Sequence, residues 1–349
     1  MKKLIYYFGS NGSDGNASMK DILGNKGAGL AEMSNLKLPI PDGFTITTEL
    51  CNYFYTHDNS FPKNFRNELR TAVEKLEATT GKVFGSTKNP LLLSVRSGSI
   101  VSMPGMMDTI LNLGMNDEVC AALGEVCKDK RFAFDSYKRF LEMYGATVLS
   151  IPSDLFEQIY ERHKIQADIY RDRDVTPELL EKIIEDFKKL HVKYAEKLIT
   201  DPYEQLESAI KAVLNSWMSN RAVIYRKINN ISESFGTAIN IQSMVFGNLS
   251  KTSATGVIFT RSPSTGEKKL FGEFLTNAQG EDIVSGTRTP LHIISDDSNS
   301  MKATMPKVFD ELSKISETLE KHYLDMQDIE FTIENSKLYI LQTRTAKRT

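Results

Sequence analysis

The stretch LSVRSGSIVSMPGMMDTILNLG, residues 93–114, is the most informative part of this chain. A short apolar run leads to one arginine, Arg96, and a loop of small and sulfur-bearing residues follows at once. Gly98 and Gly105 give that loop a backbone that can lie close to a ligand. A strand end that delivers a cation to a glycine-bearing loop is typical of phosphate-binding sites. An arginine paired with a nearby carboxylate is the equally ordinary alternative.

A second segment, GNKGAG at residues 24–29, has a similar character. Lys26 stands at the opening of a predicted helix, where free N–H groups and the helix dipole favour an anion. The GxxxxGK[ST] spacing of a Walker A loop is absent. The segment therefore indicates either an anion-binding turn or a glycine turn with a solvated lysine.

The run DIEFTIENSKLYILQTR, residues 328–344, predicts a hairpin. Strand alternation places Asp328 and Glu330 on one face. If the turn comprises residues 335–337, Glu330 lies opposite Gln342 and Asp328 lies opposite Arg344. Oxygen ligands of this kind suit a Mg²⁺ ion that bridges nucleotide phosphates. The alternative is the exposed polar face of a surface hairpin, and a register shift of one residue would move Gln342 and Arg344 off this face.

A fourth segment, TSATGVIFTRSPSTG at residues 252–266, predicts a loop of hydroxyl side chains and glycine that precedes a strand. Thr255 lies at the end of that loop, and Gly256 begins the strand. Small side chains let backbone N–H groups approach phosphate oxygens. An ordinary hairpin turn is the alternative for this segment.

The composition is that of a soluble globular protein, with 40% hydrophobic and 25% charged residues in 349. The net charge of -2 gives no electrostatic case for nucleic acid or an anionic membrane. Cys51, Cys120 and Cys127 lack the spacing of a zinc site or a disulfide framework, so we expect a cytoplasmic setting. The apolar run near the start is too short for a secretory signal, and no 18-residue apolar span occurs.

The periodicity predicts an α+β protein with a change of character in the middle. Glycine almost disappears between residues 117 and 198, and apolar residues there recur at helical spacing. Thr176 and Pro177 form a helix start inside this helical insert. Further helices are expected at 62–79, from 202 to about 228 and at 306–322. Strands are expected at 3–8, 44–47, 239–246, 256–260, 270–275, 329–333 and 338–342.

Together these segments resemble the nucleotide-binding part of the pyruvate, phosphate dikinase family. The matching runs follow the family's order over nearly the whole chain: GNKGAGLAEM, SVRSGSIVSMPGMMDTILNLG, ATGVIFTRSPSTGE, GEFLTNAQGEDIVSGTRTP and DIEFTIENSKLYILQTR. The resemblance implies an α+β ATP-grasp fold with two lobes enclosing ATP. Its first lobe would be residues 1–115 with 200–243, its helical insert subdomain 116–199 and its second lobe 244–349.

The resemblance also implies which residues handle the phosphates. Lys26 and Arg96 would be catalytic, because they would bind the phosphates and stabilise charge during phosphoryl transfer. Gly105, Thr255 and Gly256 would be loop contacts to phosphate oxygens.

At the metal, the resemblance assigns Mg²⁺ to Glu330 and Asp328, with Gln342 beside them and Arg344 as a further ATP contact. The remaining positions would contact adenine or a partner domain. The hinge between the lobes, whose backbone reads the adenine edge, would consist of Gln242, Met244 and Val245. The rim on which the phosphoacceptor domain would dock would include Arg221, Ser264 and Glu273.

Full enzymes of this family convert ATP, phosphate and pyruvate into AMP, diphosphate and phosphoenolpyruvate. The nucleotide-binding part passes the ATP β-phosphoryl group to a histidine on a swivelling domain, and a carboxyl-terminal barrel handles pyruvate. Neither the glycine-rich segment around that histidine nor the barrel occurs in these 349 residues. We therefore expect this chain to bind MgATP without making phosphoenolpyruvate. Its expected partners are ATP, phosphate and those two domains, with no nucleic acid and no membrane.

Two other readings stay open. Related phosphoenolpyruvate synthases carry an acidic stretch after the arginine, whereas this chain has the Met-Pro-Gly-Met-Met version at residues 103–107. A non-catalytic nucleotide-sensing module is the second alternative. The presence of Lys26, Arg96 and Glu330 argues against such a loss of chemistry.

Overall fold

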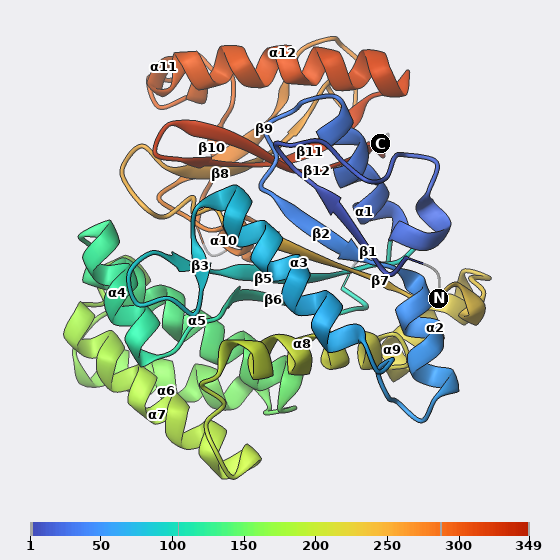
Figure 1. Ribbon diagram of the computed structural model, residues 1–349. Coiled ribbons are helices and arrows are strands. Elements are labelled where there is room, and N and C mark those ends of the chain that lie inside the picture. The colour runs from blue at the N-terminus through green and yellow to red at the C-terminus, as the bar shows by residue number, and fades with distance from the viewer. Residues whose placement is uncertain (1–2, 104, 287, 348–349) are drawn as a thin grey trace. The chain divides into compact units, whose positions relative to one another are not determined.

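A computed structural model describes residues 3–103, 105–286 and 288–347 of an α+β chain (Figure 1). The chain divides into two compact units. Unit 1 comprises Met1–Tyr7, Ser18–Gly27 and Asp42–Met244, and unit 2 comprises Phe8–Ala17, Ala28–Pro41 and Val245–Thr349. The division therefore passes through helix α1 (Lys20–Asn35). Among the described residues, no helix has the length and apolar character needed to cross a lipid bilayer.

The sheet of unit 1 has the strand order β1-β2-β7-β5-β6. In sequence order these strands are β1 (Ile5–Phe8), β2 (Gly43–Ile46), β5 (Leu93–Gly98), β6 (Thr109–Leu113) and β7 (Ala238–Ser243). Two short parallel strands, β3 (Val83–Phe84) and β4 (Pro90–Leu91), form a separate pair. One face of the large sheet is apolar and fully buried, and it carries Phe44, Val95 and Ile241. The other face carries the polar residues of the candidate site.

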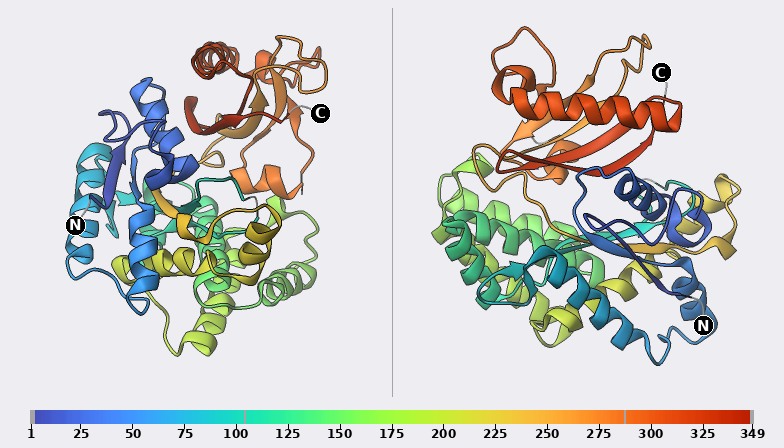
Figure 2. Two further views of the ribbon diagram at one scale, coloured as in Figure 1. Left: turned by 90° about the vertical axis from the view of Figure 1, so that its right-hand side faces the viewer. Right: turned by 45° about the horizontal axis from the view of Figure 1, so that its top comes forward.

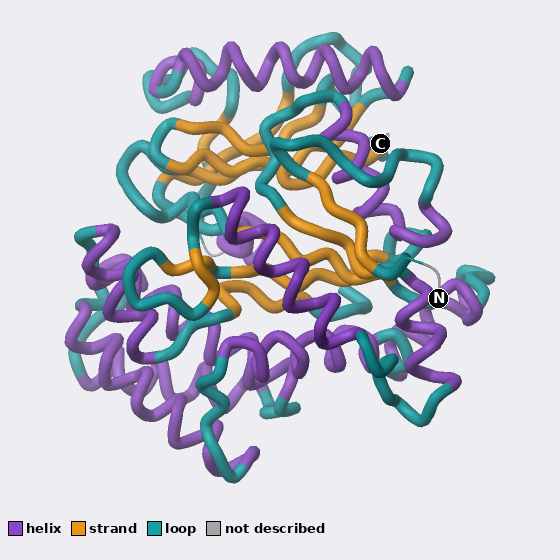
Figure 3. The backbone as a smooth tube through the Cα atoms, viewed as in Figure 1, coloured by secondary structure: helices purple, strands orange, loops and turns teal. Residues whose placement is uncertain are grey.

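Helices, purple in Figure 3, make up most of the rest of unit 1, and most of them lie between β6 and β7 in the sequence. Near the amino terminus are α2 (Thr48–Thr56) and α3 (Phe65–Thr80). The predicted helical insert contains α4 (Asp117–Cys127), α5 (Lys130–Val148), α6 (Ser153–Gln166), η1 (Asp172–Asp174) and α7 (Pro177–Ala195). The helix start at Thr176 is confirmed, because its side chain accepts a hydrogen bond from the Leu179 N–H.

The single helix expected from 202 to 228 is wrong, because the structure divides it into α8 (Pro202–Ser216) and α9 (Asn220–Ile228). Ser219 caps α9 by accepting a hydrogen bond from the Ala222 N–H. A serine at this position satisfies a backbone donor that a continuous helix would have paired internally. The short helix η2 (Glu233–Phe235) follows.

Buried His191 in α7 makes the stability of the helical insert pH-dependent. Its Nε2 donates to the Leu141 carbonyl at 2.7 Å and only 2% of the residue is exposed. Burial lowers the pKa of His191 below its ordinary 6.5, although the Leu141 bond opposes this. Below pH 6.5 the His191 imidazole therefore binds a proton in the unfolded chain but stays neutral in the folded chain until the pH is lower. We expect stability to fall between pH 7.5 and 5.5, with a slope of at most about 1.4 kcal/mol per pH unit.

Thermal or denaturant unfolding at the two pH values measures this loss, and His191→Gln should reduce it. The exposed His57 provides the control, and His191→Gln should reduce the pH dependence more than His57→Gln does. Equal pH dependence in the wild type and His191→Gln would contradict the assignment.

Unit 2 is an antiparallel sheet with α12 (Pro306–Tyr323) along one face (Figure 2). Its order is β10-β9-β8-β11-β12. The strands are β8 (Ala254–Phe259), β9 (Phe271–Thr276), β10 (Leu291–His292), β11 (Gln327–Glu334) and β12 (Lys337–Thr345), and two short helices are α10 (Gly280–Ser285) and α11 (Met301–Thr304). Ile329, Phe331 and Ile333 pack in the same buried cluster as Leu312 and Leu319 of α12. The predicted alternation in β11 is thus confirmed, and its polar residues occupy the opposite face.

Candidate functional site

The turn before Lys26 is seated on the end of strand β5. Gly24 breaks the helical geometry of α1 with φ 66° and ψ 172°. A Cβ atom at Gly24 would lie 1.8 Å from the Gly98 carbonyl oxygen, so the two backbones touch. Next to it, the Asn25 N–H donates to the Ser99 carbonyl at 2.9 Å. The residues GNKG are therefore held against the point at which β5 becomes a loop.

This contact brings the two predicted phosphate-binding segments together. A Cβ atom on Gly98 would lie 3.7 Å from the Lys26 Cβ, so Lys26 stands over the end of β5. Arg96 precedes Gly98 by two residues on the same strand, and alternation places it on the same face. Lys26 and Arg96 are both half-buried. Two cations from distant segments thus converge at one sheet end, an arrangement suited to an anionic ligand.

A polar platform, which was not predicted from the sequence, lies against this turn. Arg96 faces Asn240 on β7, and Asn240 faces Thr45 on β2. The Thr45 hydroxyl donates to Asn240 Oδ1 at 2.8 Å. A Cβ atom on Gly27 would come within 2.8–2.9 Å of both side chains. Asn240 is only 1% exposed, and its Nδ2 has no hydrogen-bond partner among the described residues.

The signal for this platform was present in the alternation of the two strands. Thr45 and Asn240 each stand between apolar residues that are fully buried. Buried polar residues at alternate positions indicate a sheet face that meets something polar.

The glycine- and methionine-bearing loop that follows β5 is bonded to helix α9. Gly105 has φ 70°, and a Cβ atom there would meet no described atom within 4 Å. Arg221 Nε donates to the Met106 carbonyl at 3.2 Å, and its guanidinium pairs with Asp108. Pro104 lies outside the described residues. Arg221, expected at a docking rim, is thus bound to this loop.

The predicted hinge residues lie where β7 ends. Gln242 is buried and faces Gly43 on β2 and Ser94 on β5. The Met244 N–H donates to the Leu92 carbonyl at 2.9 Å. The division between the two compact units falls immediately after Met244, and Val245 is the first residue on the other side.

In unit 2 the register expected for the hairpin is confirmed, although its expected turn is wrong. Asp328 lies opposite Arg344, and Glu330 lies opposite Gln342. The turn has two residues rather than three, because Glu334 faces Lys337. Asn335 and Ser336 have φ 49° and 66°, as two-residue hairpin turns require. A bulge beyond Glu330 then adds the one-residue offset that restores the expected pairs.

The carboxylate pair on β11 fits a hard divalent cation. Asp328 is 8% exposed, and Arg344 Nε donates to its Oδ2 at 2.7 Å. Its other oxygen, Oδ1, is buried and has no hydrogen-bond partner among the described residues. Glu330 shares this face and is half-buried. No group of three or more metal-binding side chains occurs in the described part of the chain. A pair of carboxylates is what Mg²⁺ takes when substrate phosphates complete its shell.

Thr255 and Gly256 lie inside β8, so the loop expected at Thr255 is wrong, whereas the strand expected from Gly256 onward is confirmed. Gly256 faces Phe331 across the sheet, and a Cβ atom there would lie 2.3 Å from that ring. Packing against Phe331 therefore explains why this position is a glycine. Thr255 lies on the opposite face, is buried and donates to the Phe331 carbonyl at 3.2 Å.

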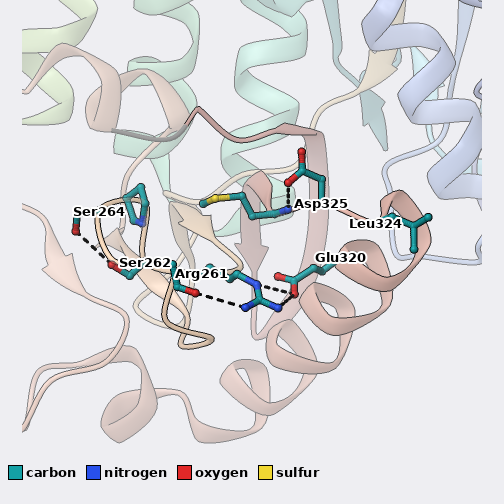
Figure 4. Close-up of a pocket in the computed structure, with 9 residues that line it drawn as sticks. Arg261, Ser262, Ser264, Glu320, Leu324 and Asp325 are labelled. Atoms are coloured by element: carbon teal, nitrogen blue, oxygen red, sulfur yellow. Dashed lines mark hydrogen bonds and ion pairs between the residues drawn. The ribbon is translucent and has the colours of Figure 1, made fainter.

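Glu273 and Ser264 lie at different places in unit 2. Glu273 is exposed on β9 and faces Val257, which in turn faces Glu330. Glu273 thus shares the sheet face of the carboxylate pair, two strands away. Ser264 belongs to the loop between β8 and β9, beside a hollow of ≈ 520 Å³ (Figure 4). There Arg261 donates to Glu320 at 2.9 and 2.7 Å.

Comparison with known proteins gives one family. The family described as "Pyruvate phosphate dikinase, AMP/ATP-binding domain" matches residues 20–60, 56–308 and 295–349. A pyruvate, phosphate dikinase of Rickettsia bellii (strain RML369-C) is 98% identical over 349 residues, which are 100% of this chain and 40% of that protein. The enzyme of that name from Rhizobium meliloti (strain 1021) is 49% identical over 357 residues, with 100% and 40% covered. The chloroplastic one from Flaveria trinervia is 50% identical over 349 residues, with 100% and 36% covered. The chain thus spans about two fifths of the length of these curated relatives.

Proposed function

This chain belongs to the pyruvate phosphate dikinase AMP/ATP-binding domain family, and on that premise we propose that it is the phosphoryl-donor part of a longer phosphotransferase. The family expected from the four sequence segments is thereby confirmed. The proposed whole reaction converts ATP, phosphate and pyruvate into AMP, diphosphate and phosphoenolpyruvate. This chain would bind ATP and release its β-phosphoryl group to a histidine on a swivelling domain. A pyruvate-binding barrel would complete the longer protein.

The proposed fold is ATP-grasp, with two lobes that enclose the nucleotide. We assign residues 1–115 with 200–243 to the first lobe, 116–199 to the helical insert and 244–349 to the second lobe, although residues 8–17 and 28–41 belong to the same compact unit as the second lobe. Two separate five-stranded sheets, each with one polar face, support this assignment. Gln242, Met244 and Val245 would join the lobes and present backbone groups to the adenine edge.

The observation that carries the proposal is the contact between Gly24 and Gly98, which seats Lys26 over the end of the Arg96 strand. In the proposed mechanism Lys26 and Arg96 bind the phosphate chain and offset the charge that grows on the transferred group. The open turn at Gly105 would offer backbone N–H groups to phosphate oxygens. Thr255 is proposed as a further contact, whereas Gly256 is better explained by its packing against Phe331.

Asp328 and Glu330 would hold the Mg²⁺ ion that accompanies ATP, with Gln342 and Arg344 beside them. Asp328 Oδ1 supports this assignment, because it is buried and has no hydrogen-bond partner in the described part of the chain, which is costly for a carboxylate oxygen. A Mg²⁺ ion bound there would neutralise phosphate charge. Arg344 keeps the Asp328 carboxylate in place through its bond to Oδ2.

Calorimetry of ATP binding, with and without Mg²⁺, tests this proposal. We expect the wild-type chain to bind MgATP, and Glu330→Gln and Asp328→Asn each to weaken binding by about tenfold or more. Without Mg²⁺ the variants and the wild type should differ little. Glu317→Gln, an exposed carboxylate on α12, is the control and should bind as the wild type does. A wild-type chain that binds no MgATP would contradict the proposed function.

A second measurement addresses phosphoryl transfer. The histidine domain of a relative is supplied to this chain with ATP labelled at either the β or the γ position. Label should reach the histidine from the β position only. Complete absence of transfer by a chain that binds MgATP would instead favour a nucleotide-sensing module.

A cytoplasmic setting is part of the proposal as well. The thiols of Cys51 and Cys120 are buried, and burial raises their pKa to about 11 and about 12. Thiols of this kind are inert packing groups, which accords with a reducing compartment.

A further inference from the structure

The loop at residues 99–108 is fastened at both of its ends within unit 1. At its start the Asn25 N–H donates to the Ser99 carbonyl at 2.9 Å. At its end Arg221 Nε donates to the Met106 carbonyl at 3.2 Å, and the same guanidinium pairs with Asp108. The first fastening comes from the segment that carries Lys26. The second comes from α9, which lies more than a hundred residues further along the chain.

The hydrogen bond from Arg221 to the Met106 carbonyl restrains the turn at Gly105. The Met106 N–H donates to the Met103 carbonyl at 3.2 Å and closes this turn. Gly105 has φ 70°, and a Cβ atom there would meet no described atom within 4 Å, its chain neighbours left aside. The Met106 carbonyl bound by Arg221 belongs to the residue immediately after Gly105. A guanidinium that fixes this carbonyl therefore also fixes the orientation of the turn.

Arg221 extends from a well-packed helix junction, although its position in α9 is electrostatically unfavourable for a cation. It lies in the first turn of α9, where the helix dipole disfavours a cation. Its pairing with Asp108 offsets that cost. Behind it, Arg226 is 1% exposed, donates to the Trp217 carbonyl and stacks on the Trp217 ring at 4.0 Å. This cluster fixes the junction between α8 and α9, from which Arg221 reaches the loop.

We infer that Arg221 is a positioning residue that holds the Gly105 turn in the form that receives the phosphates of ATP. This inference rests on the proposed function, because it gives the loop a nucleotide to receive. It also differs from the docking role expected for Arg221, since a residue that only docks a partner domain has no effect on ATP binding by this chain.

Two measurements on the 349-residue chain test the inference. Amide hydrogen exchange reports how firmly the loop is held, and calorimetry reports the affinity for MgATP. In Arg221→Ala we expect faster exchange at residues 99–109 and about fivefold weaker MgATP binding. Asp108→Asn should behave similarly, and the double variant should be little worse than either single one. Arg221→Lys keeps the charge and loses the fork, so it should lie between the wild type and Arg221→Ala.

Arg66→Ala is the matched control, because Arg66 makes a comparable exposed ion pair with Glu207 at 3.0 Å in unit 1. It should change neither measurement, and circular dichroism should show all variants folded. Unchanged exchange in Arg221→Ala overturns the inference whether or not ATP binds. Unchanged affinity in Arg221→Ala, with a wild type that binds, also overturns it and leaves the proposed function standing. A wild type that fails to bind MgATP overturns the proposed function, and with it the nucleotide role of the loop.

Discussion

Gly24→Ala is expected to destabilise the chain by about 3 kcal/mol or more and to abolish measurable binding of MgATP. The backbone of Gly24, at φ 66° and ψ 172°, lies in a region that is essentially restricted to glycine. In addition, a methyl group there would lie 1.8 Å from the Gly98 carbonyl oxygen, which is backbone and cannot rotate away. The turn would have to leave the end of β5 and would take Lys26 with it.

Gly81→Ala is a control that separates the cost of backbone strain at positive φ from the cost of the steric clash with Gly98. Gly81 ends α3 with φ 68°, and a Cβ atom there would meet nothing described within 4 Å. This variant should cost only about 1–2 kcal/mol, the ordinary penalty of a left-handed alanine. Its affinity for MgATP should equal that of the wild type. Denaturant unfolding and calorimetry measure both quantities. Equal losses of stability in the two variants would show that Gly24 and Gly98 do not touch as described.

Lys26→Ala is expected to weaken MgATP binding by about a hundredfold while leaving the stability of the chain nearly unchanged. Lys26 is half-buried over the end of β5, so its ammonium would meet the phosphates partly shielded from water. Removal of one charge-assisted contact in such a place costs far more than removal of a solvated lysine. Calorimetry measures the affinity, and thermal unfolding measures the stability.

Lys20→Ala is the matched control for this prediction. Lys20 begins the same helix and is exposed, and its removal changes the net charge equally. It should alter the affinity by no more than about twofold, because its charge is screened by water and salt. If Lys26→Ala binds as tightly as Lys20→Ala, the phosphate assignment of the GNKGAG segment is wrong.

In the hairpin at residues 327–345, the cross-strand pairs were predicted correctly although the length of the turn was predicted incorrectly. The alternation of Asp328 and Glu330 with apolar residues is a local property, and it predicted the polar face without any tertiary information. The expected three-residue turn is replaced by two residues, Asn335 and Ser336, in left-handed geometry. Only the bulge returns Gln342 to its place opposite Glu330. Bulges of this kind leave little trace in a sequence, because they depend on how the strands pack.

Thr255 and Arg221 show a second limit. A run of hydroxyl and glycine residues resembles a loop, and at Thr255 the structure has a strand instead, since Gly256 makes room for Phe331 on β11. For Arg221 the sequence predicts a docking role, which stays a prediction, and gives no sign of the bonds to Met106 and Asp108 that the structure shows. In each case the deciding neighbour is remote in sequence.

The sequence by itself determined which segments form helices or strands, which faces of the strands are apolar, and the family. It also identified Lys26 and Arg96 as two candidates for binding phosphate. These properties follow from local periodicity and from motifs whose residues are neighbours in the chain. Tertiary structure alone decided which backbones touch, as at Gly24 and Gly98, and which polar groups meet, as at Thr45 and Asn240, 195 residues apart. Such contacts depend on the packing of whole sheets and helices, and local propensity carries no record of distances between segments that meet only when the chain has folded.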